Sequence, residues 1–563
     1  MGSSRLAQLA RAQWHWLLPA GVILGLLWPL LFSDRTFSTD WGNHLWVIWA
    51  QGLNVRDLGE PSYFLQSSFG LFYPNFAFYG GSMYAVLGTA SWLTSPVAAA
   101  TLGYAAALAA SYLGWTWLAR QAGVEGWRAQ LPGAIAVTAP LAVTNLYGRG
   151  DIPEVVATSF IPLVLASGLA VFRAPRTRLP AAAAYVLSVA VLTGTHTLTL
   201  AWGTVFLAIC ALLLVLSDWA AARARARARR GLAVAGLTVL GAGLNAWILM
   251  PLVFLHTRLI EQEPDPIALT EYTDPDVLFS IFRDAGDPPV ITADVDAQLP
   301  VLALLWALVC GALFWRLLPG WGRRLAVGVL ALGGALLALV LEPTLIEDLP
   351  KVLAFIQFPY RIVTYVTLCA VGLVTLALAA MQREGSAARL PVLALAAIAA
   401  FNFGLSLQQN SEVRSWLEDR DEALVSSVEP PRTWYAPLQF ADGSAPVVAP
   451  TLRPLEIPVA DRRDVYSTTY PPGPAGTAET NIAVGDYLVD VEGAEPAGRT
   501  EDGRMVLRLP RSPDRPREVE VRAEWGAEVT IGRWLTILSL LAAAGLVAHC
   551  LVARRRERRG RVG

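Results

Sequence analysis

Charged residues are scarce in this chain. Asp, Glu, Lys and Arg make up 16% of its 563 residues and hydrophobic residues 54%, whereas a soluble globular protein carries about 25% charge. Lysine is nearly missing, since Lys351 is the only one. Apolar stretches of about 17–25 residues recur along the chain, and such lengths predict helices that cross a hydrocarbon core.

Several signatures of soluble catalysis and metal binding are missing as well. The four cysteines all lie in apolar stretches and offer neither a metal-ligand spacing nor a disulfide framework. No GxxxxGK(S/T), HExxH or GxSxG motif is present, which argues against a cytoplasmic nucleotide enzyme. The formal net charge is −1. A nucleic-acid partner would require an outward-facing basic stripe, and the sequence does not show one.

The arginines are grouped in short segments, and one choice of sides places every group in the cytoplasm. These segments are 5–11, 120–128, 173–178, 223–230, 316–324, 383–389 and 554–561. Cytoplasmic loops of membrane proteins carry an excess of arginine and lysine. We therefore expect a multi-pass plasma-membrane protein with both termini in the cytoplasm and its chemistry outside. No small-residue cleavage site follows the first span, which predicts an uncleaved signal anchor.

The expected fold class is an all-α polytopic membrane protein with about twelve transmembrane helices. Their approximate ranges are 14–32, 98–119, 130–146, 155–172, 181–195, 197–216, 231–252, 299–317, 325–342, 361–381, 390–407 and 532–552. Segment 76–95 is interpreted as re-entrant or interfacial, because a span there would place the 120–129 loop outside, against the charge bias. The two short spans that flank His196 suggest that one of them is broken or tilted.

The domain organisation follows from these spans. A transmembrane domain is expected over 1–407, with outer loops 33–97 and 256–298. The first loop is rich in aromatic residues, which favour the membrane interface, and its DWGNHLWVIWAQGL run predicts an interfacial helix. Segments of alternating polarity between Pro/Gly turns predict a small extracytoplasmic β-rich domain over 408–530. Residues 531–563 would form the last helix and a basic cytosolic tail.

Asp40 and His44 follow the first span in STDWGNH. Four positions apart, they share one face if the segment is helical. A carboxylate held just outside the membrane can take a proton from an acceptor hydroxyl as a general base. Alternatively, Asp40 caps the interfacial helix.

The motif GRGDIPE lies in the outer loop between the third and fourth spans. Arg149 could bind a phosphate, and Asp151 and Glu154 could bind a metal or a sugar. A structural alternative is a capping box with Asp151 as N-cap and Glu154 at N3. Both roles are compatible in one residue.

Two further residues lie at the predicted outer membrane edge. His196, in GTHT, is either a buried residue satisfied by its neighbouring threonines or a functional group, since ionisable groups in membrane spans are often functional. Arg361, in FPYR, lies on the side that arginine otherwise avoids. It either extends to the interface beside Tyr360 or holds an anionic lipid phosphate.

The order and common sidedness of these motifs resemble GT-C-type membrane glycosyltransferases. Within this superfamily the chain is most similar to a bacterial family of multi-span proteins whose label mentions 6-pyruvoyl-tetrahydropterin synthase. The resemblance rests on DWGNH, the Phe72–Gly81 stretch, YGRGxxPE, His196 and FPYR, and covers roughly residues 14–400. A pterin activity is not expected, because that enzyme uses a zinc site rich in histidine. The five histidines here, split between the two sides, cannot assemble one.

The resemblance implies an inverting enzyme that moves a sugar from a polyprenyl-phosphate carrier to an extracytoplasmic glycan, lipid or protein of the cell envelope. It implies Asp40 as base and Arg361, with Arg149, as ligands of the carrier phosphate. His44, Asp151, Glu154, His196 and Tyr360 would then bind sugar or acceptor. No cofactor is certain, and a divalent cation such as Mg²⁺ or Mn²⁺ stays open, because the D-x-x-E pattern departs from D-x-D.

Two other function classes remain open from the sequence. One is a lipid or glycan transporter, although transporters usually place polar sites near the membrane midplane. The other is a non-catalytic scaffold for envelope assembly, because a fold alone does not give a function.

Overall fold

The computed structural model describes most of the chain. The described residues are 2–31, 39–63, 65–67, 70–73, 76, 79–174, 179–217, 224–255, 274–281, 297–354, 356, 358–384, 388–419, 465–480, 482, 489–500, 505–523 and 526–559. Most of the predicted outer loop 256–298 and residues 420–464 of the predicted β-rich domain lie outside them.

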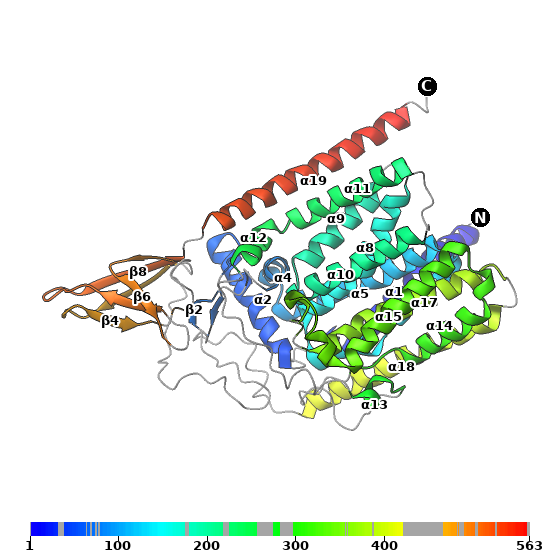
Figure 1. The fold of residues 1–563 in the computed structure, drawn as a ribbon, viewed down its shortest axis with the longest axis horizontal. Coiled ribbons are helices and arrows are strands. Elements are labelled where there is room, and N and C mark those ends of the chain that lie inside the picture. The colour runs from blue at the N-terminus through cyan, green and yellow to red at the C-terminus, as the bar shows by residue number, and fades with distance from the viewer. Residues whose placement is uncertain are drawn as a thin grey trace.

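A bundle of helices forms the main body of the molecule (Figure 1). The α-helices are α1 (Gly2–Leu31), α2 (Thr39–Leu58), α4 (Gly81–Leu93), α5 (Pro96–Gln121), α6 (Leu131–Val137), α7 (Pro140–Val143), α8 (Ile152–Arg173), α9 (Leu179–Thr193), α10 (Thr197–Leu216), α11 (Ala224–Gly243), α12 (Ala246–Leu255), α13 (Pro275–Leu278), α14 (Val301–Leu313), α15 (Gly320–Leu341), α16 (Lys351–Ala354), α17 (Val363–Met381), α18 (Arg389–Asp419) and α19 (Ala527–Arg559). Shorter 3-10 or π-helical segments are η1 (Gly126–Gln130), η2 (Thr144–Arg149), η5 (Trp315–Leu317), η6 (Pro343–Ile346) and η7 (Pro359–Ile362).

Seven of the described helices are long and apolar enough to cross a membrane. They are α5, α8, α10, α15, α17 with η7, the first part of α18, and α19. An eighth span results if α11 and α12, which meet at an angle of 84°, count as one broken span. Helices satisfy their backbone polar groups internally, which the hydrocarbon core requires. Among the seven, α17, α8 and α5 are the most buried and α19 the least, so the first three form the centre of the bundle.

Several helices differ from the predicted spans. The expected span 130–146 is divided into α6, α7 and η2, and Pro140 begins α7 because proline lacks the N–H that a continuing helix needs. Neither helix beside His196 is broken: α9 and α10 are each continuous, and the break lies between α11 and α12 instead. Helix α18 continues to Asp419, past the predicted domain boundary at 407.

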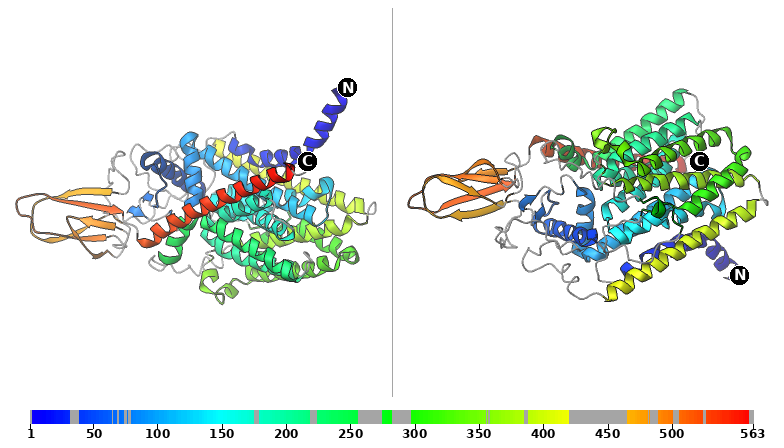
Figure 2. Two further views of the ribbon diagram at one scale, coloured as in Figure 1. Left: turned by 90° about the horizontal axis from the view of Figure 1, so that it is seen from above. Right: turned by 60° about the horizontal axis from the view of Figure 1, so that its bottom comes forward.

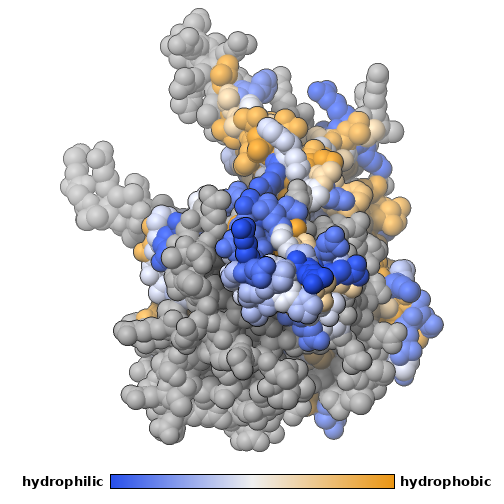
Figure 3. Space-filling model, turned by 90° about the vertical axis from the view of Figure 1, so that its left-hand side faces the viewer, coloured by the Kyte–Doolittle hydropathy of each residue, from blue (hydrophilic) through white to orange (hydrophobic). Residues whose placement is uncertain are grey.

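Two small antiparallel sheets lie at one end of the molecule, whereas both chain termini lie at the other (Figures 1 and 2). Their strands are β3 (Val465–Tyr470), β4 (Gly476–Glu479), β5 (Val489–Glu492), β6 (Glu495–Arg499), β7 (Met505–Leu509) and β8 (Arg517–Ala523), in the orders β3-β8-β5 and β4-β7-β6. In β7 the side chains of Met505, Leu507 and Leu509 are buried and Arg508 is exposed, which is the alternation expected for a half-buried strand. Seen from this end, the described surface of the sheets is mainly hydrophilic (Figure 3).

Arginines of the predicted cytoplasmic segments bind the carboxyl ends of helices. Arg173 donates to the carbonyl oxygen of Gln121 at the end of α5 over 3.0 Å. Arg324 donates to the carbonyl of Ser217 just after α10 over 2.8 Å. Cations at helix C-termini satisfy the last carbonyls and interact favourably with the helix dipole. These arginines therefore have a structural use of their own in the folded chain.

The helix α4 begins close to the loop that carries His196. The N–H of Met83 donates to the carbonyl of Gly194 over 3.1 Å, and the short hairpin of β1 (Leu65–Ser67) and β2 (Gly70–Tyr73) precedes α4 in the chain. Gly80 has a left-handed backbone with φ +62°, and a Cβ added there would lie 2.6 Å from the Tyr84 ring and 3.1 Å from the Thr195 carbonyl oxygen. Glycine at this position permits the close approach.

The variant Gly80→Ala is expected to lower the free energy of unfolding by more than Gly59→Ala. Gly59 also has a positive φ, +76°, but a Cβ there would meet nothing within 4 Å. Gly59→Ala therefore measures only the left-handed strain, roughly 1–2 kcal/mol, and Gly80→Ala adds the contact with Tyr84. Denaturant unfolding in detergent micelles, followed by circular dichroism, gives both values. Equal losses would show that the α4 contact contributes nothing.

Candidate functional site

The GRGDIPE motif forms a tight connection between a π-helical turn and α8. The π-helix η2 ends at Arg149, and Gly150 then has a left-handed backbone with φ +68°. Asp151 follows as the N-cap of α8, where its Oδ1 accepts a hydrogen bond of 3.0 Å from the Glu154 N–H. The predicted capping role of Asp151 is thus confirmed. Single π-helical turns frequently occur at functional sites.

Two arginines and two carboxylates meet in a buried network at the start of α8. The Arg149 guanidinium contacts Asp151 Oδ2 and Glu154 Oε2, each over 2.9 Å. Arg361, from η7, lies with Nε 3.2 Å from Glu154 Oε2 and Nη2 4.0 Å from Asp151 Oδ2. All four residues are buried. Two cations are therefore matched by two anions, which offsets much of the cost of burying them.

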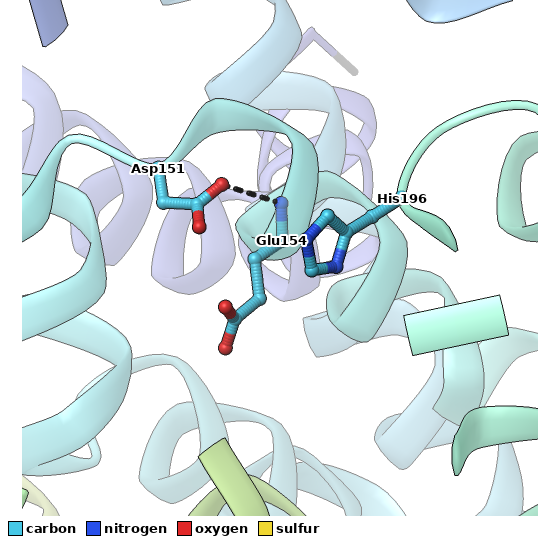
Figure 4. Close-up of side chains that lie close together, drawn as sticks. All are labelled: Asp151, Glu154 and His196. Atoms are coloured by element: carbon cyan, nitrogen blue, oxygen red, sulfur yellow. Dashed lines mark hydrogen bonds between the residues drawn. The ribbon is translucent and has the colours of Figure 1, made fainter. Parts of the chain in front are cut away.

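The two carboxylates differ in how many of their oxygens already have partners in this network. Both oxygens of Asp151 are engaged, one by the α8 backbone and one by Arg149. Glu154 points away from Asp151 (Figure 4), and only its Oε2 pairs with the arginines. Its Oε1 accepts no hydrogen bond from the residues that the structure describes. Arg361 Nη1 is buried and likewise has no hydrogen-bond partner among them. Arg361 Nε also makes no hydrogen bond there, although it lies within ion-pair distance of Glu154 Oε2. Donor groups of Arg361 and the Oε1 acceptor of Glu154 thus remain for a ligand.

The FPYR motif places aromatic rings against the two arginines. The Tyr360 ring lies 5.1 Å from the guanidinium carbon of Arg149, and the Phe358 ring 5.5 Å from that of Arg361. The two rings stack on each other with centroids 5.5 Å apart. Guanidinium groups are attracted to aromatic faces. Tyr360, predicted as a ligand-binding residue, therefore fixes Arg149 in place.

The two histidines flank Asp151. His196 is the N-cap of α10, and its Nδ1 accepts from the Thr199 N–H over 3.3 Å and lies 2.7 Å from the Thr199 hydroxyl. His44, from α2, lies with Nδ1 2.6 Å from the Tyr84 hydroxyl and Nε2 3.8 Å from Asp151 Oδ1. The Tyr79 ring lies between them, 5.6 Å from the ring of His196 and 6.4 Å from that of His44.

The structure therefore brings together seven of the eight predicted site residues. Asp40 is the exception. Its backbone belongs to α2, four positions before His44, so both positions fall on one face of this helix. The Asp40 side chain lies outside what the structure describes. Tyr84 and Asn145, which contacts Arg149 over 3.4 Å, were not predicted. Tyr84 reaches the site only through a tertiary contact with His44. Asn145 lies four positions before Arg149 in η2, so its place before GRGDIPE is the one signal in the sequence that could have found it.

Three long helices begin at this network. They are α8 at Asp151, α10 at His196, and η7 with α17 at Arg361. The amino ends of helices carry partial positive charge and attract anions. Their partial positive charge adds to that of the two arginines and stabilises the buried carboxylates of Asp151 and Glu154.

The surroundings of Asp151 and His196 lower the pKa of each group, for different reasons. Burial alone would raise the pKa of Asp151, but the Arg149 guanidinium and the other neighbouring cationic groups outweigh it and hold that pKa well below its usual range. Burial lowers the pKa of His196 to about 3, although Asp151 opposes this. At neutral pH the carboxylate is charged and the imidazole neutral.

This difference predicts a pH dependence of stability. His196 has a folded pKa of about 3, below its ordinary value of 6.5, so the unfolded chain binds one more proton between these pH values. The unfolding equilibrium constant should therefore rise about tenfold per pH unit as pH falls from 6 to 4 through this one group. His196→Asn keeps an N-cap side chain and should give a shallower slope in detergent-micelle unfolding. An unchanged slope would show that His196 is protonated alike in both states.

The geometry argues against the predicted alternative of a divalent cation. Asp151, Glu154 and His196 offer donor atoms within 4.8 Å of one another (Figure 4). However, Asp151 is paired with Arg149 and the α8 backbone. His196 Nδ1 accepts from a backbone N–H, which places the proton of the neutral ring on Nε2 and removes the lone pair that a metal needs. The donor set does not fit the cation.

Comparison of the chain with family models, with curated proteins and with solved structures gives no match. Functional inference therefore starts from the geometry of the site.

Proposed function

We propose that the chain is an integral-membrane glycosyltransferase of GT-C type. It moves a sugar, with inversion, from a polyprenyl-phosphate-linked donor to an acceptor of the cell envelope. In this proposal the chain crosses the plasma membrane about twelve times with both termini in the cytoplasm, and the shorter and broken helices α1, α6–η2, α9, α11–α12 and α14 supply the crossings beyond the seven long helices.

One observation carries the proposal: a buried arginine with an unused donor at the start of three helices. Arg361 is paired through Nε and Nη2, yet its Nη1 has no partner among the described residues. A buried N–H without a partner costs free energy comparable to a lost hydrogen bond. A phosphate oxygen supplies the missing acceptor, and arginine binds phosphates with its planar fork.

The other residues then have distinct roles. Arg149 and Arg361 hold the carrier phosphate, and Glu154 Oε1 accepts a hydrogen bond from sugar or acceptor. Asp40 takes the proton of the acceptor hydroxyl, whose oxygen attacks the anomeric carbon. The bond from that carbon to the phosphate oxygen breaks, and the polyprenyl phosphate leaves with the electron pair. Asp151, His44 and His196 position this set, with Tyr360 stacked beneath Arg149.

A direct test uses the purified chain in proteoliposomes made with lipids of its own membranes, labelled metabolically in their sugars. Transfer of label from lipid to an envelope acceptor fraction is expected for the wild type. An absence of transfer with every acceptor fraction from those membranes would contradict the proposal.

A non-catalytic scaffold is a second candidate, because the network is balanced between two cations and two anions. Such a balance would suffice to join α8, α17 and η2 without any ligand. Neutralising all outer carboxylates without loss of function in the cell would favour this candidate.

A further inference from the structure

A cavity of about 60 Å³ lies next to the charge network, one helical turn further into the bundle. Its lining residues belong to α5, α6, α7, η2, α8 and α17. Thr158 lies one turn after Glu154 on α8, and Thr364 follows Arg361 by three residues at the start of α17. Its polar lining residues are Ser111, Asn145, Thr158, Ser159, Thr364 and Thr367.

Four hydroxyls that line this cavity are unpaired. Those of Ser111, Ser159, Thr364 and Thr367 make no hydrogen bond to any residue that the structure describes, and the hydroxyl of Thr367, a residue only 8% exposed, is fully buried. A buried hydroxyl without a partner costs roughly 1–3 kcal/mol.

Other hydroxyls of the bundle behave differently. Thr116, Thr138 and Thr375 each donate to the carbonyl four residues earlier, over 2.8–2.9 Å, as hydroxyls in helices commonly do. Ser111, Ser159 and Thr367 lie within α-helices, where the same bond is open to them, and do not make it. What the four hydroxyls share is that their residues line one cavity.

The rest of the lining is apolar. Leu108, Val155 and Leu368 contribute walls beside the hydroxyls. A single water needs about 10–15 Å³ of such space, so the cavity exceeds the needs of one or two waters. A lining that combines hydroxyls with apolar side chains suits a pyranose ring, which has hydroxyls at its rim and C–H groups on its faces.

We propose that this cavity binds a sugar ring, namely the glycosyl group whose phosphate is held by Arg149 and Arg361. This inference rests on the proposed function and specifies where its sugar lies. Asn145 joins the two parts, since it lines the cavity and contacts Arg149 over 3.4 Å. Phosphate and sugar then occupy adjoining spaces, as one glycosyl phosphate requires.

The test measures binding of free methyl pyranosides of glucose, galactose, mannose and N-acetylglucosamine to the full chain in nanodiscs, by saturation-transfer NMR. At least one should bind the wild type. Thr367→Val and Ser111→Ala should each weaken it roughly five- to tenfold, the effect of one lost hydrogen bond. Ser159→Leu, which fills the cavity, should abolish it. The matched control is Thr375→Val on the same helix, whose hydroxyl is already bonded to Val371, and its affinity should equal that of wild type.

Two outcomes overturn the inference. One is that no pyranoside binds the wild type. The other is that binding survives both Thr367→Val and Ser159→Leu in variants whose gel-filtration profile and circular dichroism match those of the folded wild type.

Arg361→Gln separates the cavity assignment from the proposed function. It removes the phosphate ligand but not the cavity, so pyranoside binding should persist. If the wild type retains a lipid phosphate but binds no pyranoside, only the cavity assignment is contradicted. If it binds a pyranoside but retains no lipid phosphate, only the phosphate site is contradicted.

Discussion

Replacing Arg149 by methionine should lower the free energy of unfolding by about 3–5 kcal/mol, the usual cost of removing one partner from a buried ion pair. Arg149 makes the two shortest contacts in the network, 2.9 Å to Asp151 and 2.9 Å to Glu154. Arg361 alone lies 3.2 Å from Glu154 and 4.0 Å from Asp151. Two buried carboxylates would then share one cation.

The control for this prediction is an exposed pair in the same chain. Arg533 and Glu60 lie 3.5 Å apart with half-exposed side chains, and surface pairs contribute about 0–1 kcal/mol. Glu60→Gln should therefore be nearly neutral in the same denaturant titration. If Arg149→Met costs no more than Glu60→Gln, the network does not stabilise the junction of α8 with η7.

The second large effect is on catalysis, and it separates Asp40 from Glu154. Asp40→Asn should lower the rate of sugar transfer about 10²–10⁴-fold, the usual contribution of a general base, with unfolding unchanged. Glu154→Gln should lower both transfer and stability, because Glu154 Oε2 pairs with Arg149 and Arg361. Rates from proteoliposomes and unfolding curves from micelles give the two readouts. Full activity in Asp40→Asn would remove Asp40 as the base.

The motifs of the site could be found in the sequence, but their contacts could not. The arginine groups and apolar stretches indicate which helix ends lie at the same end of the bundle, and GRGDIPE contains its own N-cap signal at Asp151. The pairing of Arg361 with Glu154 joins residues more than two hundred positions apart. It depends on the tertiary packing that brings η7 and the start of α17 to the start of α8, which no local pattern encodes.

Hydropathy also does not predict where the helices break. Residues 131–143 are apolar apart from Thr138, yet Pro140 divides them, and a π-helical turn at 144–149 redirects Arg149 toward the carboxylates. A hydropathy profile records the burial of such a segment but not its backbone path. Tyr84 was not predicted for a similar reason. Its hydroxyl contacts His44, and the two residues belong to different helices, α4 and α2.

The central claim is that Arg361 holds a lipid-borne phosphate. The most direct measurement is mass spectrometry of lipids that co-purify from the native membranes with wild type, with Arg361→Gln and with Arg533→Gln. Arg533 is the control because it is exposed and far from the network in sequence. The proposal predicts a polyprenyl phosphate or polyprenyl phosphosugar with wild type and Arg533→Gln, reduced at least tenfold with Arg361→Gln. Bulk phospholipid alone in all three would contradict it.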